Sequence, residues 1–257
     1  MKKIMLAVSA LVLGTVAASA ADMAVKARPA PAPLVVYNWT GCYIGGNVGG
    51  GWARTGQDQI GKVDGTVFVP PGNFGSSEGS DFIGGVQIGC DYQFAGNWVL
   101  GVQGMFDFGN IDSEHTLPAF PAFYSANSTK NVFTLTGRLG YLFAPQVLAY
   151  VKGGGAWARI DHSVYGFGPP AFLSESAGGV DRSGWTVGGG LEWMFAPGWS
   201  VFGEYNYMDF GHNDVRFVQA PGTVGVADVV RTHLEVQQVL VGVNYKFNFG
   251  GPVVAKY

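Results

Sequence analysis

The sequence predicts an all-β protein, an eight-stranded antiparallel transmembrane β-barrel with four long extracellular loops and three short periplasmic turns. Three observations lead to this prediction. Apolar residues recur at every second position in eight segments, the connections between segments alternate between short and long, and aromatic residues gather beside the short connections. A period of two is that of a β-strand with two different faces, and in a membrane barrel the apolar face points outward to lipid.

The alternation is clearest in the last segment, residues 239–247. All of its odd positions are apolar, and Leu240 is the exception among the small or polar even positions. Seven earlier segments repeat the pattern, so each is expected to form one strand with its apolar face toward lipid. In chain order, with a residue of each apolar face, the segments are 42–52 (Val48), 82–94 (Ile88), 98–108 (Val102), 133–143 (Leu139), 147–157 (Val151), 185–195 (Leu191), 199–207 (Val201) and 239–247 (Val243).

Three polar residues, His233, Glu235 and Gln237, continue the apolar parity of the last segment upstream. Polar side chains do not face the lipid interior without cost. The sequence leaves two interpretations: this part of the strand lies above the lipid, or it contains a β-bulge.

The connections are of two kinds. The short ones are residues 95–97, 144–146 and 196–198, whereas the long ones, about 53–80, 113–130, 162–183 and 210–232, are polar and rich in Gly and Pro. Short turns at one end and long loops at the other are typical of an outer-membrane barrel. A soluble β-sandwich or lipocalin-like carrier is the competing fold, but it has no reason to segregate its loops by length.

Aromatic residues next to the short connections predict a girdle at one membrane interface. The alternative is that aromatic residues simply favour strands. The girdle residues are Phe94, Trp98, Tyr141, Phe143, Phe195, Trp199, Tyr245 and Phe247.

The N-terminus predicts export. Lys2 and Lys3 precede an apolar run over residues 4–13, and Ala18-Ser19-Ala20 matches a signal-peptidase site, so we expect a signal peptide cleaved after Ala20. The expected organisation is a signal peptide (1–20), a Pro/Ala-rich periplasmic linker (21–38), the outer-membrane barrel (39–249) and a C-terminal tail (250–257).

Composition and motifs argue against several functions. The formal net charge is −3, too small to indicate a nucleic-acid partner. The sequence contains no G-x-S-x-G, P-loop, H-E-x-x-H or C-x-x-C motif, and its triple-glycine runs lack the strand-to-helix context of phosphate binding. We therefore expect no enzymatic activity, no cofactor and no metal.

Charged residues on the inward parity form the main candidate site. Arg138, Lys152, Glu192 and Glu204 come from four consecutive strands at similar distances from the short turns, and we expect them to neutralise one another in a belt. Asp107, Asp91 and Lys246 are expected to extend this network above and below. Two interpretations compete: a sealed structural plug, or a set of ion pairs that rearranges to admit ions or small solutes.

The cysteines and histidines carry weaker hypotheses. Cys42 and Cys90 lie on the outward parity of adjacent strands, where a cross-strand disulfide is conceivable, but two small lipid-facing thiols are the preferred interpretation. The histidines fall in or beside the long loops, so a rim that captures haem or a metal is a further hypothesis. They are His115, His162, His212 and His233.

The export signal, the segment APAPLVVYNWTGCYIGGNVGGGWA and the strand VGVNYKF resemble the small outer-membrane β-barrel proteins of alphaproteobacteria, a RopB-like group within a broader set similar to the OmpA transmembrane barrel. The resemblance covers the mature chain and implies an eight-stranded barrel with a structural or porin-like role. Its last strand, with Gly242, Tyr245 and Phe247, resembles the signal read by the outer-membrane assembly machinery. That signal usually ends a chain, whereas residues 248–257 continue here, leaving Phe249 or Tyr257 as alternatives.

The leading function hypothesis is a non-enzymatic outer-membrane protein that contributes to membrane structure and cell-surface properties. The alternatives are a narrow porin with a charged lumen, and a surface protein whose loops bind a ligand or a host surface. The expected partners are outer-membrane lipid, lipopolysaccharide and the assembly machinery; the sequence does not indicate an oligomeric state.

Overall fold

The computed structural model describes residues 37–167, 171–223 and 225–247, and these residues form one antiparallel β-sheet. The expected signal peptide, most of the linker and the C-terminal tail lie outside the described residues. Within this part of the chain, no helix is long and apolar enough to cross a membrane. The strands are β1 (Gly41–Lys62), β2 (Val67–Phe94), β3 (Trp98–Thr116), β4 (Phe123–Ala144), β5 (Val147–Gly166), β6 (Phe172–Ala196), β7 (Trp199–Arg216), β8 (Val218–Gln219) and β9 (Asp228–Phe247).

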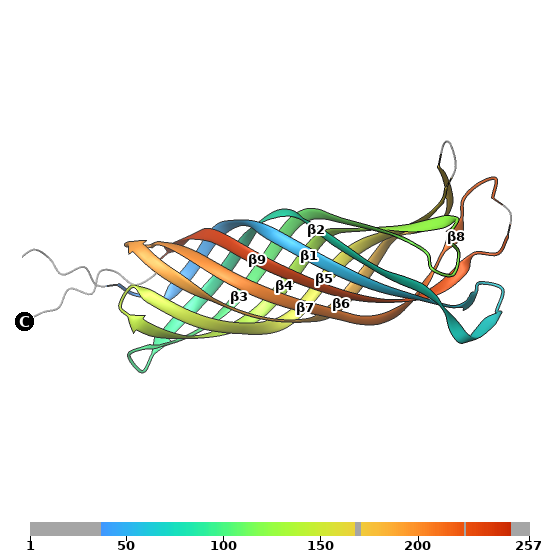
Figure 1. Cartoon of the computed structure of the whole chain (residues 1–257). Helices are drawn as coiled ribbons and strands as arrows, with labels where there is room; N and C mark the ends of the chain where they lie inside the picture. Colours follow the sequence, from blue (N-terminus) through green and yellow to red (C-terminus); the bar gives the residue numbers. More distant parts are fainter. Residues whose placement is uncertain (1–36, 168–170, 224, 248–257) are drawn as a thin grey trace, which may run out of the picture. The chain divides into compact units, whose positions relative to one another are not determined.

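The sheet closes on itself. Its order is β5-β4-β3-β2-β1-β9-β7-β6-β8, and a further pairing of β5 with β6 joins the two sides into a barrel (Figure 1). This confirms the all-β antiparallel class. The sheet has nine strands where the sequence predicted eight, because the two residues of β8, within the connection from β7 to β9, pair with β6 at Glu175 and Ser176.

The first and last long strands meet at the seam of the barrel. β1 pairs with β9 from Cys42 opposite Phe247 to Lys62 opposite Asp228, with one register shift between Gln59 and Gly61. Closure satisfies the backbone groups that an open sheet would leave unpaired at its edges. The sequence-based expectation that these two strands must meet is therefore confirmed.

The faces of the strands follow the predicted parity. All eight residues of the predicted aromatic girdle have exposed side chains, and Trp199 packs against Tyr245 across the strands at a ring-centroid distance of 4.9 Å. A second set of exposed aromatics lies at the far end of the apolar band. It includes Trp52, Phe82, Phe108, Phe133, Trp157, Trp185 and Tyr205. Strand segments of about eleven residues, tilted as in membrane barrels, give an apolar band about 25 Å tall.

The predicted long loops are wrong in extent. Most of residues 53–80, 113–130, 162–183 and 210–232 continue the strands, so the barrel wall extends beyond the apolar band (Figure 1). The inward side chains of these extensions form an apolar cluster that includes Phe74, Val164 and Val215. Their outward positions are polar or small, which removes the hydrophobic alternation without removing the hydrogen-bonded ladder. The segment Val67-Phe68-Val69, which the sequence left open as a short strand, begins β2.

The polar stretch before the last apolar segment lies above the lipid band. Through His233, Glu235 and Gln237, the pairing of β9 with β1 runs without a register shift. A shift between β9 and β7 occurs beside this stretch, between Asp209 and His212. The three side chains therefore keep the outward parity, which supports the first of the two interpretations.

The interior is filled in layers. At the short-turn end, Trp39 packs with Val99, Leu148 and Met194. A charged layer follows, and an apolar cluster farther along the barrel includes Leu240. Leu240, the exception to the polar parity of β9, is thus an inward core residue with 0% exposure.

Candidate functional site

The seven charged residues expected to point inward all lie in the barrel interior, between 0% and 5% exposed. Each comes from a different strand, because alternation places one face of every strand toward the lumen. They are Asp91 on β2, Asp107 on β3, Arg138 on β4, Lys152 on β5, Glu192 on β6, Glu204 on β7 and Lys246 on β9.

The first cluster is centred on Arg138. Its Nε and Nη2 donate to the two carboxylate oxygens of Asp91 at 2.8 and 2.6 Å, and its Nη1 donates to Glu192 at 3.0 Å. The guanidinium also lies over the rings of Tyr43 and Tyr150, at 5.1 and 4.9 Å from their centroids. A bidentate Arg–carboxylate contact of this kind is among the strongest and most directional of charged hydrogen bonds.

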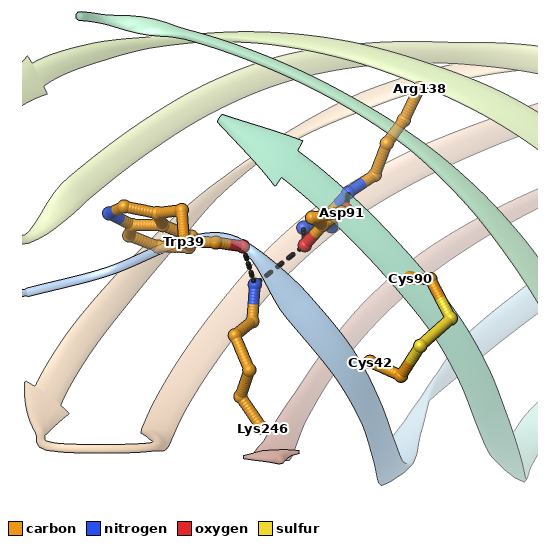
Figure 2. The surroundings of a disulfide bond; sticks show 6 residues. All are labelled: Trp39, Cys42, Cys90, Asp91, Arg138 and Lys246. Atoms are coloured by element: carbon orange, nitrogen blue, oxygen red, sulfur yellow. Dashed lines mark hydrogen bonds and ion pairs between the residues drawn. A yellow bond between two sulfur atoms is a disulfide. The ribbon is translucent and has the colours of Figure 1, made fainter. Parts of the chain in front are cut away.

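Lys246 completes this cluster at the short-turn end. Its Nζ donates to Asp91 at 2.6 Å and to the backbone oxygen of Trp39 at 2.9 Å (Figure 2). The indole of Trp39 is fully buried and donates to the backbone oxygen of Pro145 in the second short turn. The residues just before β1 therefore cover the charged cluster from the end of the lumen.

The second cluster pairs Lys152 with Glu204. Lys152 Nζ donates to Glu204 Oε1 at 2.7 Å and to Gln103 Oε1 at 3.1 Å. The Tyr150 hydroxyl donates to Glu204 Oε2 at 2.8 Å, and Asn206 Nδ2 donates to Oε1 at 2.9 Å. Both oxygens of this buried carboxylate are thus satisfied.

The grouping differs from the predicted belt. Arg138 and Lys152 face each other directly across β4 and β5, where like charges repel. Asp91 and Lys246, expected at the margins, belong to the central cluster because Asp91 on β2 binds Arg138 across the lumen. Strand spacing along the sequence does not reveal which side chains meet across a lumen.

Asp107 lies apart from both clusters. Its Oδ1 accepts a hydrogen bond from Asn47 Nδ2 at 3.2 Å, and Asn47 is also bonded to Gln87. Among the described residues, no Lys or Arg forms an ion pair with Asp107. The sequence expectation that Asp107 extends the network is met only through neutral amides.

The arrangement is suited to holding charges in place rather than to chemistry on a substrate. Glu192 accepts Ser200 Oγ at 2.6 Å and Asn244 Nδ2 at 3.1 Å, in addition to Arg138. Buried charges are tolerated when ion pairing and hydrogen bonds together replace their hydration. The sequence analysis missed Trp39, Tyr43 and Tyr150, although tyrosines on the inward parity were a visible signal.

The predicted assembly-signal residues lie on β9 at the seam. Tyr245 and Phe247 point outward, opposite Ile44 and Cys42 of β1. Gly242 points inward, where a Cβ would lie 2.5 Å from the backbone oxygen of Gly46 and 2.5 Å from the Phe202 ring. The seam therefore requires glycine at this position for a packing reason of its own. Phe249 and Tyr257 lie outside the described residues.

Cys42 and Cys90 form a disulfide, so the preferred interpretation of two free thiols is wrong. The two residues pair directly in the β1–β2 register and share the outward face, which brings their Cβ atoms together. Figure 2 shows the bond next to the charged cluster, where Cys90 precedes Asp91 on β2.

The disulfide gives a direct test. Denatured, unreduced protein is expected to contain no free thiol, because the two cysteines of the chain are bonded to each other. Reduction before denaturation should release two thiols, as measured with a chromogenic thiol reagent. Two thiols without reduction would contradict the bond.

The histidines do not gather on one rim. His162 is buried and bonded to Asn127, and His115 Nε2 lies 2.7 Å from the backbone oxygen of Phe74. His212 and His233 stack at 4.5 Å on the outward face. Among the described residues, no group of three His, Cys, Asp or Glu side chains is arranged to hold a metal ion.

A pair of carboxyl groups occupies the strand-extension end of the barrel. Glu175 on β6 is 7% exposed, and its Oε2 accepts the backbone N–H of Asp228 at 2.9 Å. Asp228 Oδ1 accepts Gln59 Nε2 at 2.7 Å and lies 3.4 Å from Lys62 Nζ. Burial, and secondarily the neighbouring Asp228, raises the pKa of Glu175 to about 7.

This pKa predicts a pH dependence of stability. The folded-state pKa lies above the unfolded value of 4.5, so the contribution of Glu175 is fully present below about pH 4.5 and is lost as the pH rises through about 7. Burial lowers the pKa of His162 to about 4, which has the opposite effect in the acid range. Glu175→Gln removes only the first effect.

The wild type should therefore lose more stability than Glu175→Gln between about pH 5 and about pH 8, because His162 contributes equally to both proteins. Urea unfolding midpoints at the two pH values measure this difference. Identical changes in the two proteins would contradict the assignment.

Comparisons with known proteins agree with this geometry. The family model described as "Outer membrane protein beta-barrel domain" matches residues 8–247. The 31 kDa outer-membrane immunogenic protein of Brucella melitensis biotype 1 is 30% identical over 257 residues, covering 96% of this chain and all of that protein. The 25 kDa outer-membrane immunogenic protein of Brucella abortus biovar 1 is 27% identical over 259 residues, covering 96% and 99%.

A solved structure, the outer membrane protein OprG of Pseudomonas aeruginosa, matches with a TM-score of 0.48 and 16% identity over 84% of this chain and 100% of that chain. At this TM-score the likeness adds nothing to the assignment. A family model that spans most of the chain and relatives that match it nearly end to end show that the chain belongs to the small outer-membrane β-barrel proteins of alphaproteobacteria.

Proposed function

We propose that the protein is a closed, non-enzymatic barrel of the outer membrane that contributes to membrane structure and to the properties of the cell surface. The observation that carries this proposal is the filled lumen. Arg138, Glu192 and Asp91 bond to one another across it, and each is at most 5% exposed. Buried Trp39 on one side of this cluster and the apolar cluster with Leu240 on the other leave the charges covered from both directions.

In this proposal the strand extensions and their connections face the outside of the cell, and the three short turns face the periplasm, as in other outer-membrane barrels. The signal peptide is removed after Ala20. The apolar band contacts lipid and lipopolysaccharide, while the seam strand β9 is presented to the assembly machinery. These assignments follow from the outward apolar face, the two aromatic sets and the export signal.

The porin alternative requires more than a change of ion-pair partners. A solute would have to displace the Arg138 cluster and also the apolar cluster that includes Met105 and Leu240. Separating a buried ion pair without replacing its partner costs about 3–5 kcal/mol. The closed form is therefore the one that the interior contacts favour.

Planar-bilayer recording tests this proposal. Purified wild-type protein, shown to be folded and inserted by its heat-dependent gel mobility, is expected to give no discrete conductance steps. Glu192→Gln, which removes one charge from the Arg138 cluster, serves as the comparison variant. Reproducible steps in the wild type that change in size in Glu192→Gln would replace the closed-barrel proposal with the porin.

A further inference from the structure

A cavity opens at the strand-extension end of the barrel, far along the chain from the charged lumen. Its volume is about 380 Å³. Cavities of about 300–1,000 Å³ are typical of sites for small molecules. Four phenylalanines, Phe68, Phe74, Phe120 and Phe123, line it together with Glu175 and Asp228.

The phenylalanines give the cavity an aromatic wall. Phe74 is 2% exposed and belongs to the apolar cluster at this end, and Phe123 packs against the same cluster. Phe120 stands edge-on to Phe74 at a centroid distance of 5.9 Å and is 45% exposed. Such a wall combines apolar contact area with ring faces, which attract cations by their quadrupole.

The opposite side of the cavity is acidic. Glu175 and Asp228 place two carboxyl groups within reach of one backbone N–H, and Lys62 is the one basic side chain among the described residues that line the cavity. Lys62 Nζ lies 3.4 Å from Asp228, and its side chain is 35% exposed. Glu175 has no ion pair with a basic residue in the described part of the chain. The cavity therefore joins aromatic rings to a buried carboxyl group without a cationic partner.

We propose that this cavity binds a small organic ammonium ion with an apolar or aromatic body. The body packs against Phe74, Phe120 and Phe123, and the ammonium group donates hydrogen bonds to the carboxylate of Glu175. A neutral analogue keeps the packing but loses the charge pairing, and a carboxylate analogue meets repulsion from Glu175 and Asp228. The proposal goes beyond the closed barrel and does not depend on whether the lumen conducts.

A series of three ligands of nearly equal shape tests the charge requirement. Phenethylammonium, phenethyl alcohol and phenylacetate are titrated into the full-length protein in lipid nanodiscs at about pH 8, and heats of binding are measured against protein-free nanodiscs. The ammonium is expected to bind at least about tenfold more tightly than the alcohol, a difference of about 1.4 kcal/mol. Phenylacetate is expected to bind most weakly.

Three variants locate the site. Glu175→Gln should reduce the preference for the ammonium over the alcohol to near unity, while Phe120→Ala should weaken both. Glu78→Gln is the matched control, because Glu78 is a carboxylate of the same barrel whose side chain is 74% exposed beside Arg54, outside this cavity. It should leave all three affinities unchanged.

Equal binding of ammonium and alcohol by the wild type, or no saturable binding of either, would overturn the proposal. So would an unchanged preference in folded Glu175→Gln. The ligand series on the wild type decides the question even if a variant fails to fold.

Discussion

Replacing Arg138 by leucine is expected to lower the free energy of unfolding by about 3–5 kcal/mol. Arg138 donates to both oxygens of Asp91 and to Glu192, and its side chain is 1% exposed. Leucine would leave two buried carboxylates with Lys246 as the remaining cation of the cluster. The loss is large because the carboxylates stay buried after their partner is gone. Urea titration of the folded barrel, followed by tryptophan fluorescence, measures it.

Arg159→Leu is the matched control. Arg159 also forms a two-pronged contact with an aspartate, Asp181, at 2.9 and 3.2 Å, but the side chains are 58% and 74% exposed. Exposed ion pairs contribute about 0–1 kcal/mol. Equal losses in the two variants would show that the geometry of the pair, rather than its burial, sets its contribution, and would contradict the prediction.

Replacing Gly242 by valine is expected to destabilise the barrel by about 3 kcal/mol or more, because overpacking is costly where the neighbour cannot move. The first added carbon would lie 2.5 Å from the backbone oxygen of Gly46, which belongs to the strand across the seam. It would also lie 2.5 Å from Phe202, a buried side chain. The expected result is a sharp fall in the folded fraction after dilution from urea into lipid vesicles, read from unheated gels.

Gly203→Val provides the comparison. Gly203 pairs with Val241, the residue next to Gly242, but faces outward, and a Cβ there would meet no atom within 4 Å. It should therefore fold like the wild type. Because refolding in vesicles contains no assembly machinery, normal refolding of Gly242→Val would assign this glycine to recognition in the cell and contradict the packing argument. Partial recovery in Gly242→Val combined with Phe202→Ala would support it.

The strand faces could be predicted because alternation is a local property. In residues 239–247 the side chains project to opposite faces whatever the rest of the chain does, so the outward Val243 and the inward Lys246 follow from parity. The three short turns follow from the same local information. The sequence failed where local patterning stopped: the wall above Trp52 and Trp157 has polar outward residues, and its alternation is carried by inward residues such as Phe74 and Val164.

The candidate site was predictable as a set of inward charges but not as a set of contacts. Arg138 and Lys152 lie opposite each other on neighbouring strands, yet each bonds to a carboxylate farther along the ring. Which side chains meet across a lumen depends on how strongly the strands are staggered when the barrel closes. A sequence without its closed geometry does not contain that information in readable form.

The sequence by itself determined that the chain is exported, that its strands carry one apolar and one polar face, and that charged residues of both signs point away from lipid. Only the tertiary structure decided that Asp91 binds Arg138, that Cys42 and Cys90 join, and that Trp39 covers the charged cluster. The physical reason is range. Facing is set by neighbouring residues within one strand, whereas partners are set by closure of the ring, which brings together side chains that are far apart in the sequence.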